Sequence, residues 1–236
     1  MKYNDWSLLT VLLLTVLLFI GNWSLVTGYW SLVTVPSLQP LTQMTQVSIT
    51  DLVNGVRAGC VVSFPTDTVP ALAVLPQKAD LLFAAKQRSQ DKPLILMGSV
   101  ADDLWEFVTG SREERLVWQQ VAAKYWAGAL TLVLPASDRV PKTMNPTDPT
   151  TIGLRVPNCA TARNILSQTG PLATTSANKS GQPPLTTMAS IAAQFPDVLT
   201  LQSELATENS VIGTPSTVAK WMGTHWEILR QGAVYL

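Results

Sequence analysis

The sequence P-L-A-T-T-S-A-N-K-S-G, from Pro171 to Gly181, gathers hydroxyl, amide and lysine side chains in one short polar segment directly after apolar residues. At its centre stands S-A-N, from Ser176 to Asn178. A loop of this composition directs several hydrogen-bond donors at one anionic ligand and leaves little bulk in the way. We therefore predict that this segment is a loop that contacts an anion.

Around this segment, the chain from Ser48 onward alternates between patterns typical of helices and of buried strands. Short apolar runs bounded by glycine or proline predict strands, and longer amphipathic stretches predict helices. Thr50 is expected to cap the first helix, with Gly59 just beyond its end. We expect helices at 49–58, 79–88, 104–107, 113–125, 160–168 and 185–195, and strands at 60–64, 93–97, 130–134, 152–156, 198–201, 216–220 and 226–230. The alternation predicts one α/β domain with a mixed sheet.

Composition limits the classes of function. The formal net charge of the 236 residues is zero, so no global field attracts nucleic acid, and any RNA contact would need a local patch. Cys60 and Cys159 lie far apart without a partner motif, which argues against a zinc site and a disulfide framework and favours a reducing compartment. The single histidine, His225, has no nucleophile paired with it in the sequence, so we predict no histidine general base.

The segment before Met44 differs from the rest of the chain. No charged residue occurs between Asp5 and Asp51, and near copies of W-S-L-V-T begin at Trp6, Trp23 and Trp30. Three interpretations stay open: a mis-assigned start, with Met44 as the true first residue, a membrane anchor, or a cleaved signal peptide. We expect residues 1–43 to be separate from a domain over 44–236, and a genuine leader would attach the protein to a membrane through residues 1–35.

The tripeptide Thr66-Asp67-Thr68 follows the strand predicted at 60–64. Ligands of α/β proteins commonly gather just past the carboxyl ends of strands, so these side chains are candidates for a site. The alternative is a turn in which Asp67 caps a helix.

Lys86, Arg88 and Lys92 place three cations within seven residues, near the end of a predicted helix. Such a group could clamp a triphosphate, because ammonium and guanidinium groups neutralise the charge that develops in nucleotidyl transfer. The alternative is a solvated face whose cations favour the helix C-terminus.

Arg155 stands inside the apolar strand sequence G-L-R-V-P. A buried charge needs a partner, which is either the carboxylate of a ligand or one of the chain's own acids.

Seven short motifs occur in the order found in the YrdC-type threonylcarbamoyl-AMP synthases, which this chain resembles from about Val47 to its C-terminus. They are P-T-D-T-V (65–69), K-Q-R with K-P-L (86–88 and 92–94), G-A-L-T-L-V-L (128–134), G-L-R-V-P (153–157), S-A-N (176–178), P-S-T-V (215–218) and L-R-Q-G-A (229–233). The resemblance implies a single YrdC-like α/β domain. In that fold a twisted mixed parallel and antiparallel sheet is flanked by helices and leaves an open concave ligand groove.

The resemblance also implies an activity, that of a nucleotidyltransferase which forms L-threonylcarbamoyladenylate from L-threonine, bicarbonate or carbon dioxide, and ATP, with release of pyrophosphate. This product would feed a partner transferase that modifies the adenosine next to the anticodon in tRNA. Mg²⁺ is expected to accompany the ATP without metal ligands of the protein's own, and the location is expected to be cytoplasmic.

The family's site residues carry over to positions that match its motifs. Threonine would be held by Thr68, Arg155 and Ser216, with Arg155 meeting its carboxylate. The ATP site would be lined by Lys86, Arg88, Pro93, Thr151, Ser176, Asn178 and Arg230. Of these, Lys86, Arg88, Ser176 and Asn178 would act at the reacting groups, with Ser176 between the two ligands.

The chain departs from the family pattern at two places in these motifs. Pro70-Ala71-Leu72 replaces the Y-G-L that commonly follows P-T-D-T-V, and Ala127 stands where a proline commonly precedes Gly128. The sequence also ends at Leu236, so we expect it to lack the extra C-terminal domain of longer family members.

Two other functions stay open. One is an RNA-binding module of the same fold without adenylation activity, although no aromatic platform for bases is visible near its candidate phosphate contacts, Lys78, Lys142, Lys179 and Lys220. The other is carbamoyl transfer as part of a larger maturation enzyme, but the chain carries no acylphosphatase-like or zinc-finger addition.

Overall fold

The computed structural model describes residues 45–87, 89, 92–206 and 213–236. The predicted leader, residues 1–43, and the predicted ligand residue Arg88 both lie outside this range. The structure therefore does not test either prediction, and both stay predictions from the sequence.

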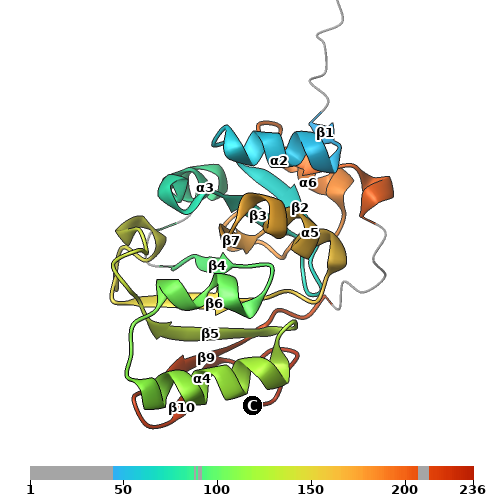
Figure 1. Cartoon of the computed structure of the whole chain (residues 1–236). Helices are drawn as coiled ribbons and strands as arrows, with labels where there is room; N and C mark the ends of the chain where they lie inside the picture. The colour runs from blue at the N-terminus through green and yellow to red at the C-terminus, as the bar shows by residue number, and fades with distance from the viewer. Residues whose placement is uncertain (1–44, 88, 90–91, 207–212) are drawn as a thin grey trace, which may run out of the picture. The chain divides into compact units, whose positions relative to one another are not determined.

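A mixed sheet of ten strands runs through the described residues (Figure 1). Its spatial order is β1-β8-β2-β3-β7-β4-β6-β5-β9-β10, with parallel pairs such as β4 and β6 next to antiparallel pairs such as β5 and β6. The strands are β1 (Gln46–Val47), β2 (Val62–Phe64), β3 (Ala71–Val74), β4 (Ile95–Met97), β5 (Leu130–Pro135), β6 (Thr151–Arg155), β7 (Leu172–Ser176), β8 (Leu199–Leu201), β9 (Thr217–Trp221) and β10 (Trp226–Arg230). The predicted mixed α/β fold is confirmed.

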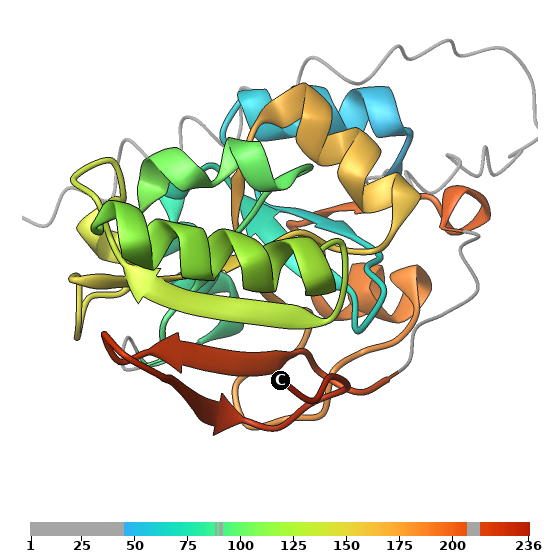
Figure 2. The same cartoon turned by 60° about the horizontal axis from the view of Figure 1, so that its bottom comes forward.

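Helices cover this sheet. They are α2 (Ile49–Arg57), α3 (Asp80–Lys86), α4 (Arg112–Tyr125), α5 (Ala160–Thr169) and α6 (Met188–Gln194). In Figure 1, α2, α5 and α4 lie in front of the strands from top to bottom, and Figure 2 shows α6 on the other side of β2. Strand β2, with helices on either side, is buried throughout, and Phe64, Leu72 and Leu154 are fully buried.

The N-cap of α2 differs from the prediction. Ser48, not Thr50, has the extended backbone before the first helical turn, and its hydroxyl accepts a hydrogen bond from the Asp51 amide at 3.2 Å. Thr50 already lies inside the helix, where its own backbone is helical. Gly59 follows the helix with φ +85°, a conformation that glycine adopts without strain, as predicted for a residue just past the helix end.

Three strands were not predicted: β1, β3 and β7. The β7 strand takes the first half of the stretch Pro171–Gly181, which was interpreted as one polar loop. Its threonines are β-branched and suit a strand, and Thr174 is buried between neighbouring strands. The S-A-N segment therefore begins at a strand end, and Ser176 pairs with Ala71 of β3.

The helix predicted at 104–107 is a short 3₁₀ turn, Trp105–Phe107. The helix predicted at 79–88 is observed as α3, which ends at Lys86 because Gln87 takes a left-handed backbone with φ 50°. In the described part of the chain, no helix combines the length and apolar character needed to cross a membrane.

Candidate active site

A groove of about 560 Å³ opens along the middle strands of the sheet. Its lining comes from segments far apart in the chain, including β3, β4, β5, β6, β7 and β9. It contains eight of the residues that the sequence predicted as ligand contacts: Thr68, Pro93, Thr151, Arg155, Ser176, Asn178, Ser216 and Arg230. The predicted residues therefore converge on one space, with Lys86 directly behind it.

Lys86, Ser176 and Asn178 form what we call the lysine cluster. The Lys86 side chain leaves the last turn of α3 and is 1% exposed. Its Nζ donates to the Ser176 carbonyl, and lies 3.2 Å from Asn178 Oδ1 and 3.4 Å from Ser176 Oγ. The alternative interpretation of a solvated cationic face is thus wrong for Lys86, because the side chain is buried against the S-A-N segment.

Asn178 is itself fixed by its neighbours. Its Nδ2 donates to the carbonyls of Lys179 and Gln182, at 2.9 and 2.7 Å. Its Oδ1 accepts from Ser176 Oγ at 2.6 Å as well as from Lys86. Asn178 therefore anchors the loop after β7 and presents Ser176 at the groove surface.

Asp67, Thr68, Arg155, Ser216 and Arg230 form what we call the arginine cluster. Arg155 is the last residue of β6 and is 4% exposed. Its Nη2 donates to Asp67 Oδ1 at 2.6 Å, its Nη1 to Thr68 Oγ1 at 2.9 Å, and its Nε to the Gly128 carbonyl at 3.1 Å. No helix begins at Asp67, so the capping interpretation is wrong, and the partner of Arg155 within the chain is Asp67.

Burial lowers the pKa of the Arg155 guanidinium, and the Asp67 carboxylate opposes that shift. A guanidinium carries five N–H donors. The contacts above use Nε, Nη1 and Nη2 once each, so one N–H on each terminal nitrogen is left for a ligand. The two interpretations of Arg155 are therefore compatible, because it can pair with Asp67 and still bind a carboxylate.

Arg230, the last residue of β10, holds Ser216 through hydrogen bonds to its carbonyl and hydroxyl oxygens. Its Nη2 donates to the Ser216 carbonyl at 2.8 Å and lies 3.2 Å from Ser216 Oγ, while its Nε donates to the same carbonyl at 3.1 Å. Partial burial lowers the pKa of Arg230. Its positive charge also contributes to the lowered pKa of Arg155, and both side chains line the same groove.

The glycine of the motif L-R-Q-G-A, Gly232, lies where the backbone before β9 leaves no room for a side chain. A Cβ on Gly232 would lie 2.2 Å from the Pro215 carbonyl oxygen and 2.5 Å from the Ser216 carbonyl carbon. The C-terminal segment also bonds back to β9, because Thr217 Oγ1 accepts from the amides of Gly232 and Val234 at 3.0 and 3.1 Å. Close backbone packing thus places Ser216 at the groove.

The rim of the groove contains residues that the sequence did not single out as ligand contacts. Asn145 Nδ2 donates to Thr151 Oγ1 at 3.2 Å, and Asp148 Oδ2 accepts from the same hydroxyl at 3.2 Å. Lys220 Nζ lies 4.0 Å from Asp148 Oδ2. A hydrogen bond from Thr150 is the main reason why the pKa of Asp148 is lowered. The polar stretch N-P-T-D-P-T was the available signal for this loop.

The departure at Pro70-Ala71 lies in the wall of the groove. Ala71 begins β3 and lines the groove, and the Pro70 carbonyl accepts a hydrogen bond from the Ala177 amide at 2.9 Å. The backbone contact to the S-A-N segment is therefore made without the aromatic residue and the glycine common in the family pattern.

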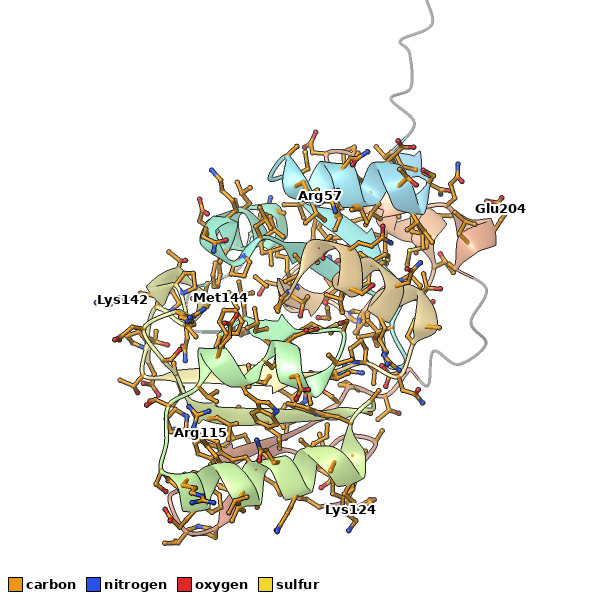
Figure 3. All side chains as sticks on the ribbon, in the orientation of Figure 1. Arg57, Arg115, Lys124, Lys142, Met144 and Glu204 are labelled. Carbon is orange, nitrogen blue, oxygen red and sulfur yellow. The ribbon has the colours of Figure 1, made fainter. Side chains whose placement is uncertain are left out.

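The lysines proposed for an RNA-binding surface do not share one site. Lys220 lines the groove, whereas Lys78, Lys142 and Lys179 are not among its lining residues. Figure 3 shows Lys142 projecting outward from the loop before β6, while the neighbouring Met144 turns inward and is fully buried. This spread gives no support to a continuous basic surface.

These features define an α/β protein whose groove, at the ends of several strands, brings buried cations and hydroxyl groups to one small ligand site. The Sua5/YciO/YrdC family model, described as "Telomere recombination", matches residues 54–232. The chain belongs to this family.

Curated relatives share one name, threonylcarbamoyl-AMP synthase. The protein of Pseudomonas fluorescens is 35% identical over 131 residues, which cover 54% of this chain and 69% of that protein. The protein of Vibrio parahaemolyticus is 30% identical over 187 residues, which cover 77% of this chain and 97% of that protein. The naming of these relatives does not favour the RNA-binding alternative.

Solved structures share the fold. The crystal structure of Pyrococcus abyssi Sua5 complexed with L-threonine aligns with a TM-score of 0.68 and 29% identity, covering 78% of this chain and 54% of that one. This chain therefore spans about half the length of that relative. Escherichia coli YciO aligns with a TM-score of 0.63 and 21% identity, which shows the fold alone.

Proposed function

We propose that this protein is a threonylcarbamoyl-AMP synthase, which forms L-threonylcarbamoyladenylate from L-threonine, bicarbonate or carbon dioxide, and ATP. The observation that carries the proposal is the convergence of eight predicted ligand residues on one groove, with two separate cationic clusters beside it. Two clusters suit two ligands of different charge. The name of the curated relatives supports the same activity.

The arginine cluster would bind threonine. The two N–H groups left on Arg155 would meet the carboxylate as a fork, and Asp67 would keep the guanidinium in a fixed plane. Thr68 and Ser216 would complete the threonine site, with the Ser216 hydroxyl donating to the same carboxylate. The Asp67 carboxylate balances the charge of Arg155, so Arg155 would hold the ligand carboxylate mainly through directed hydrogen bonds.

The lysine cluster would bind the ATP phosphates together with Arg88, whose position lies outside the described residues. Pro93, Thr151 and Arg230 would line the rest of the nucleotide site, and Ser176 would lie between the two ligands. Buried cations favour the charge that develops on the phosphates during transfer.

The chemistry asks the protein mainly to position its substrates. The neutral amine of threonine forms a bond to the carbon of CO₂ and loses a proton to solvent, which gives a carbamate. A carbamate oxygen then attacks the α-phosphorus, and the bond to the β-phosphate breaks to release pyrophosphate. Holding both ligands in one groove makes this attack intramolecular in effect, and the carbamate oxygen is already anionic, so the attack requires no histidine base.

Mg²⁺ would enter with ATP and neutralise part of the triphosphate charge. Among the described residues that line the groove, Asp148 supplies the only carboxylate, and it already accepts hydrogen bonds from Thr150 and Thr151. This donor set fits a cation that keeps most of its ligands from phosphate and water.

Further steps follow from the proposed activity. The adenylate would pass to a partner transferase that modifies the adenosine beside the anticodon of tRNA, and the protein would work in the cytoplasm.

The test is pyrophosphate release by the full chain with ATP, Mg²⁺, threonine and bicarbonate, each omitted in turn. Release that requires all of them supports the synthase. Release without threonine, or none from a folded protein, would contradict it. Lys78→Ala, which changes an exposed lysine outside the groove, serves as a control for the effect of losing a surface charge.

A further inference from the structure

The hydroxyl group of Thr131 is a buried polar group that the roles above do not use. Thr131 stands in β5, in the middle of the motif G-A-L-T-L-V-L, and lines the groove with a side chain that is 1% exposed. Its Oγ1 lies 2.9 Å from Ser216 Oγ. The described residues offer this hydroxyl no other hydrogen-bond partner, so the two side chains form one unit.

The contact can run in either direction, and the direction decides what Ser216 offers to the groove. A hydroxyl has one hydrogen to donate and two lone pairs. Arg230 Nη2 is a donor only, so it occupies one lone pair of Ser216 Oγ. If Thr131 donates as well, both lone pairs are occupied and the Ser216 hydrogen is left for a ligand. If Ser216 donates instead, it offers only a lone pair.

We propose that Thr131 is a positioning residue that donates to Ser216 and so turns the Ser216 hydroxyl hydrogen toward the substrate. The inference rests on the proposed function, in which Ser216 contacts threonine. A carboxylate accepts hydrogen bonds and donates none, so Ser216 must donate to bind it. A carboxylate bound at Arg155 would lie near Ser216, because both residues line one groove and the adjoining Gly128 and Ala129 carbonyls accept from Arg155 Nε and from the amide after Ser216, at 3.1 and 2.9 Å.

The position of Ser216 does not depend on Thr131. Arg230 holds the Ser216 carbonyl through two nitrogens, and the Gly232 backbone packs against the same peptide. Removing the Thr131 hydroxyl should therefore leave Ser216 in place and change only the direction of its hydrogen. This separation makes the role testable.

The test measures KM for threonine and for ATP in the full chain. Thr131→Val should raise the KM for threonine roughly five- to tenfold, the size of one neutral hydrogen bond, with the KM for ATP changed less than about twofold. Thr131→Ser keeps the hydroxyl and should restore the wild-type value. Thr200→Val is the matched control, because Thr200 is equally buried, bonds to the Val198 carbonyl and lies outside the groove.

A double-mutant cycle completes the experiment. In a Ser216→Ala background, Thr131→Val should add no further increase in the KM for threonine, since its effect passes through Ser216. If Thr131→Val alone leaves that KM unchanged while Ser216→Ala raises it, the inference is wrong and the proposed function stands. Equal increases for threonine and ATP would indicate a merely structural role and also overturn it.

Two further results of the experiment also bear on the role of Thr131. If Ser216→Ala leaves the KM for threonine unchanged, the proposed threonine site fails, and the inference fails with it. If Thr131→Val does not fold, Thr131→Ala takes its place in the cycle, because it removes the same hydroxyl and puts no methyl group in its place beside Ser216.

Discussion

The lysine cluster and the arginine cluster both bury a cation beside the groove, but they are assembled differently. The lysine cluster joins two segments, the end of α3 and the three residues from Ser176. The arginine cluster joins four, because its members follow β2, end β6, precede β9 and end β10. The first therefore joins one helix end to one strand end, and the second ties four parts of the sheet together.

The two cations also differ in geometry. Arg155 is planar, and each of its three nitrogens has a fixed partner, so it gives direction as well as charge. Lys86 is a compact ammonium group at the end of a flexible chain. We infer that the arginine cluster orients its ligand and supports the fold, whereas the lysine cluster mainly serves its ligand.

The largest effect is expected from Asp67→Ala. This change leaves Arg155 buried without its carboxylate, and the loss of one partner of a buried pair costs about 3–5 kcal/mol. Urea unfolding measures this cost. The matched control is Glu106→Ala, which breaks the exposed pair with Arg139 at the same 2.6 Å and should cost less than about 1 kcal/mol. Equal costs would show that the arginine cluster does not support the fold.

The sequence predicted the lysine cluster's loop more fully than the arginine cluster. The cation group that contains Lys86 and the S-A-N segment were each predicted to contact an anionic ligand, and the structure brings Lys86 and Asn178 together. For Arg155, sequence showed that a partner was needed but left two classes of partner open. The Asp67–Arg155 pair spans 88 positions of the chain and the Lys86–Asn178 contact spans 92, so no local pattern encodes either contact.

Of the missed strands, β1 has only two residues and β7 is polar, whereas β3 is a continuous apolar run that the prediction overlooked. The β10 strand was predicted at its observed bounds, whereas β7 was read as a loop because its threonines and serine resemble turn residues. Burial between β3 and β4 overrides that local preference. The site residues came from the family motifs, and the Asn145–Asp148 rim, which carries no such motif, was missed.

Lys86→Met should have the second largest effect, and it should fall on ATP. The change removes the charge but keeps most of the buried chain, so we expect kcat/KM for ATP to fall about 100-fold, or about 2.7 kcal/mol, with the KM for threonine nearly unchanged. Initial rates of pyrophosphate release measure both values. An equal loss in kcat/KM for threonine would contradict the assignment of the two clusters to different ligands.

Gly232→Ala should have a smaller effect, on threonine alone. The new methyl group would meet the backbone of Pro215 and Ser216, so the segment that presents Ser216 must shift. We expect a loss of about 1–2 kcal/mol in stability and a several-fold rise in the KM for threonine. Gln231→Ala, at the exposed neighbouring position, controls for disturbance of the C-terminal segment. A rise of the same size in the KM for ATP would contradict the assignment of Ser216 to threonine.

The smallest effect is expected at the rim, where the cation is exposed and its partner is distant. Lys220 lies 4.0 Å from Asp148, and the two side chains are 32% and 45% exposed. Asp148→Asn should therefore cost less than about 1 kcal/mol in unfolding free energy. If it cost as much as Asp67→Ala, burial would not be what separates the clusters from the rim.

The last prediction concerns how the loss of unfolding free energy in Asp148→Asn depends on pH. Hydrogen bonds, chiefly from Thr150, lower the pKa of Asp148 below its ordinary value of 3.8. The stabilisation is thus fully present above that value and is lost as the pH falls through the lower pKa of the folded state. Urea unfolding of the wild type and Asp148→Asn should show a constant difference between about pH 5 and 8, which shrinks only in stronger acid. A difference that already changes near neutral pH would mean that the Asp148 carboxylate does not titrate as its hydrogen bonds require.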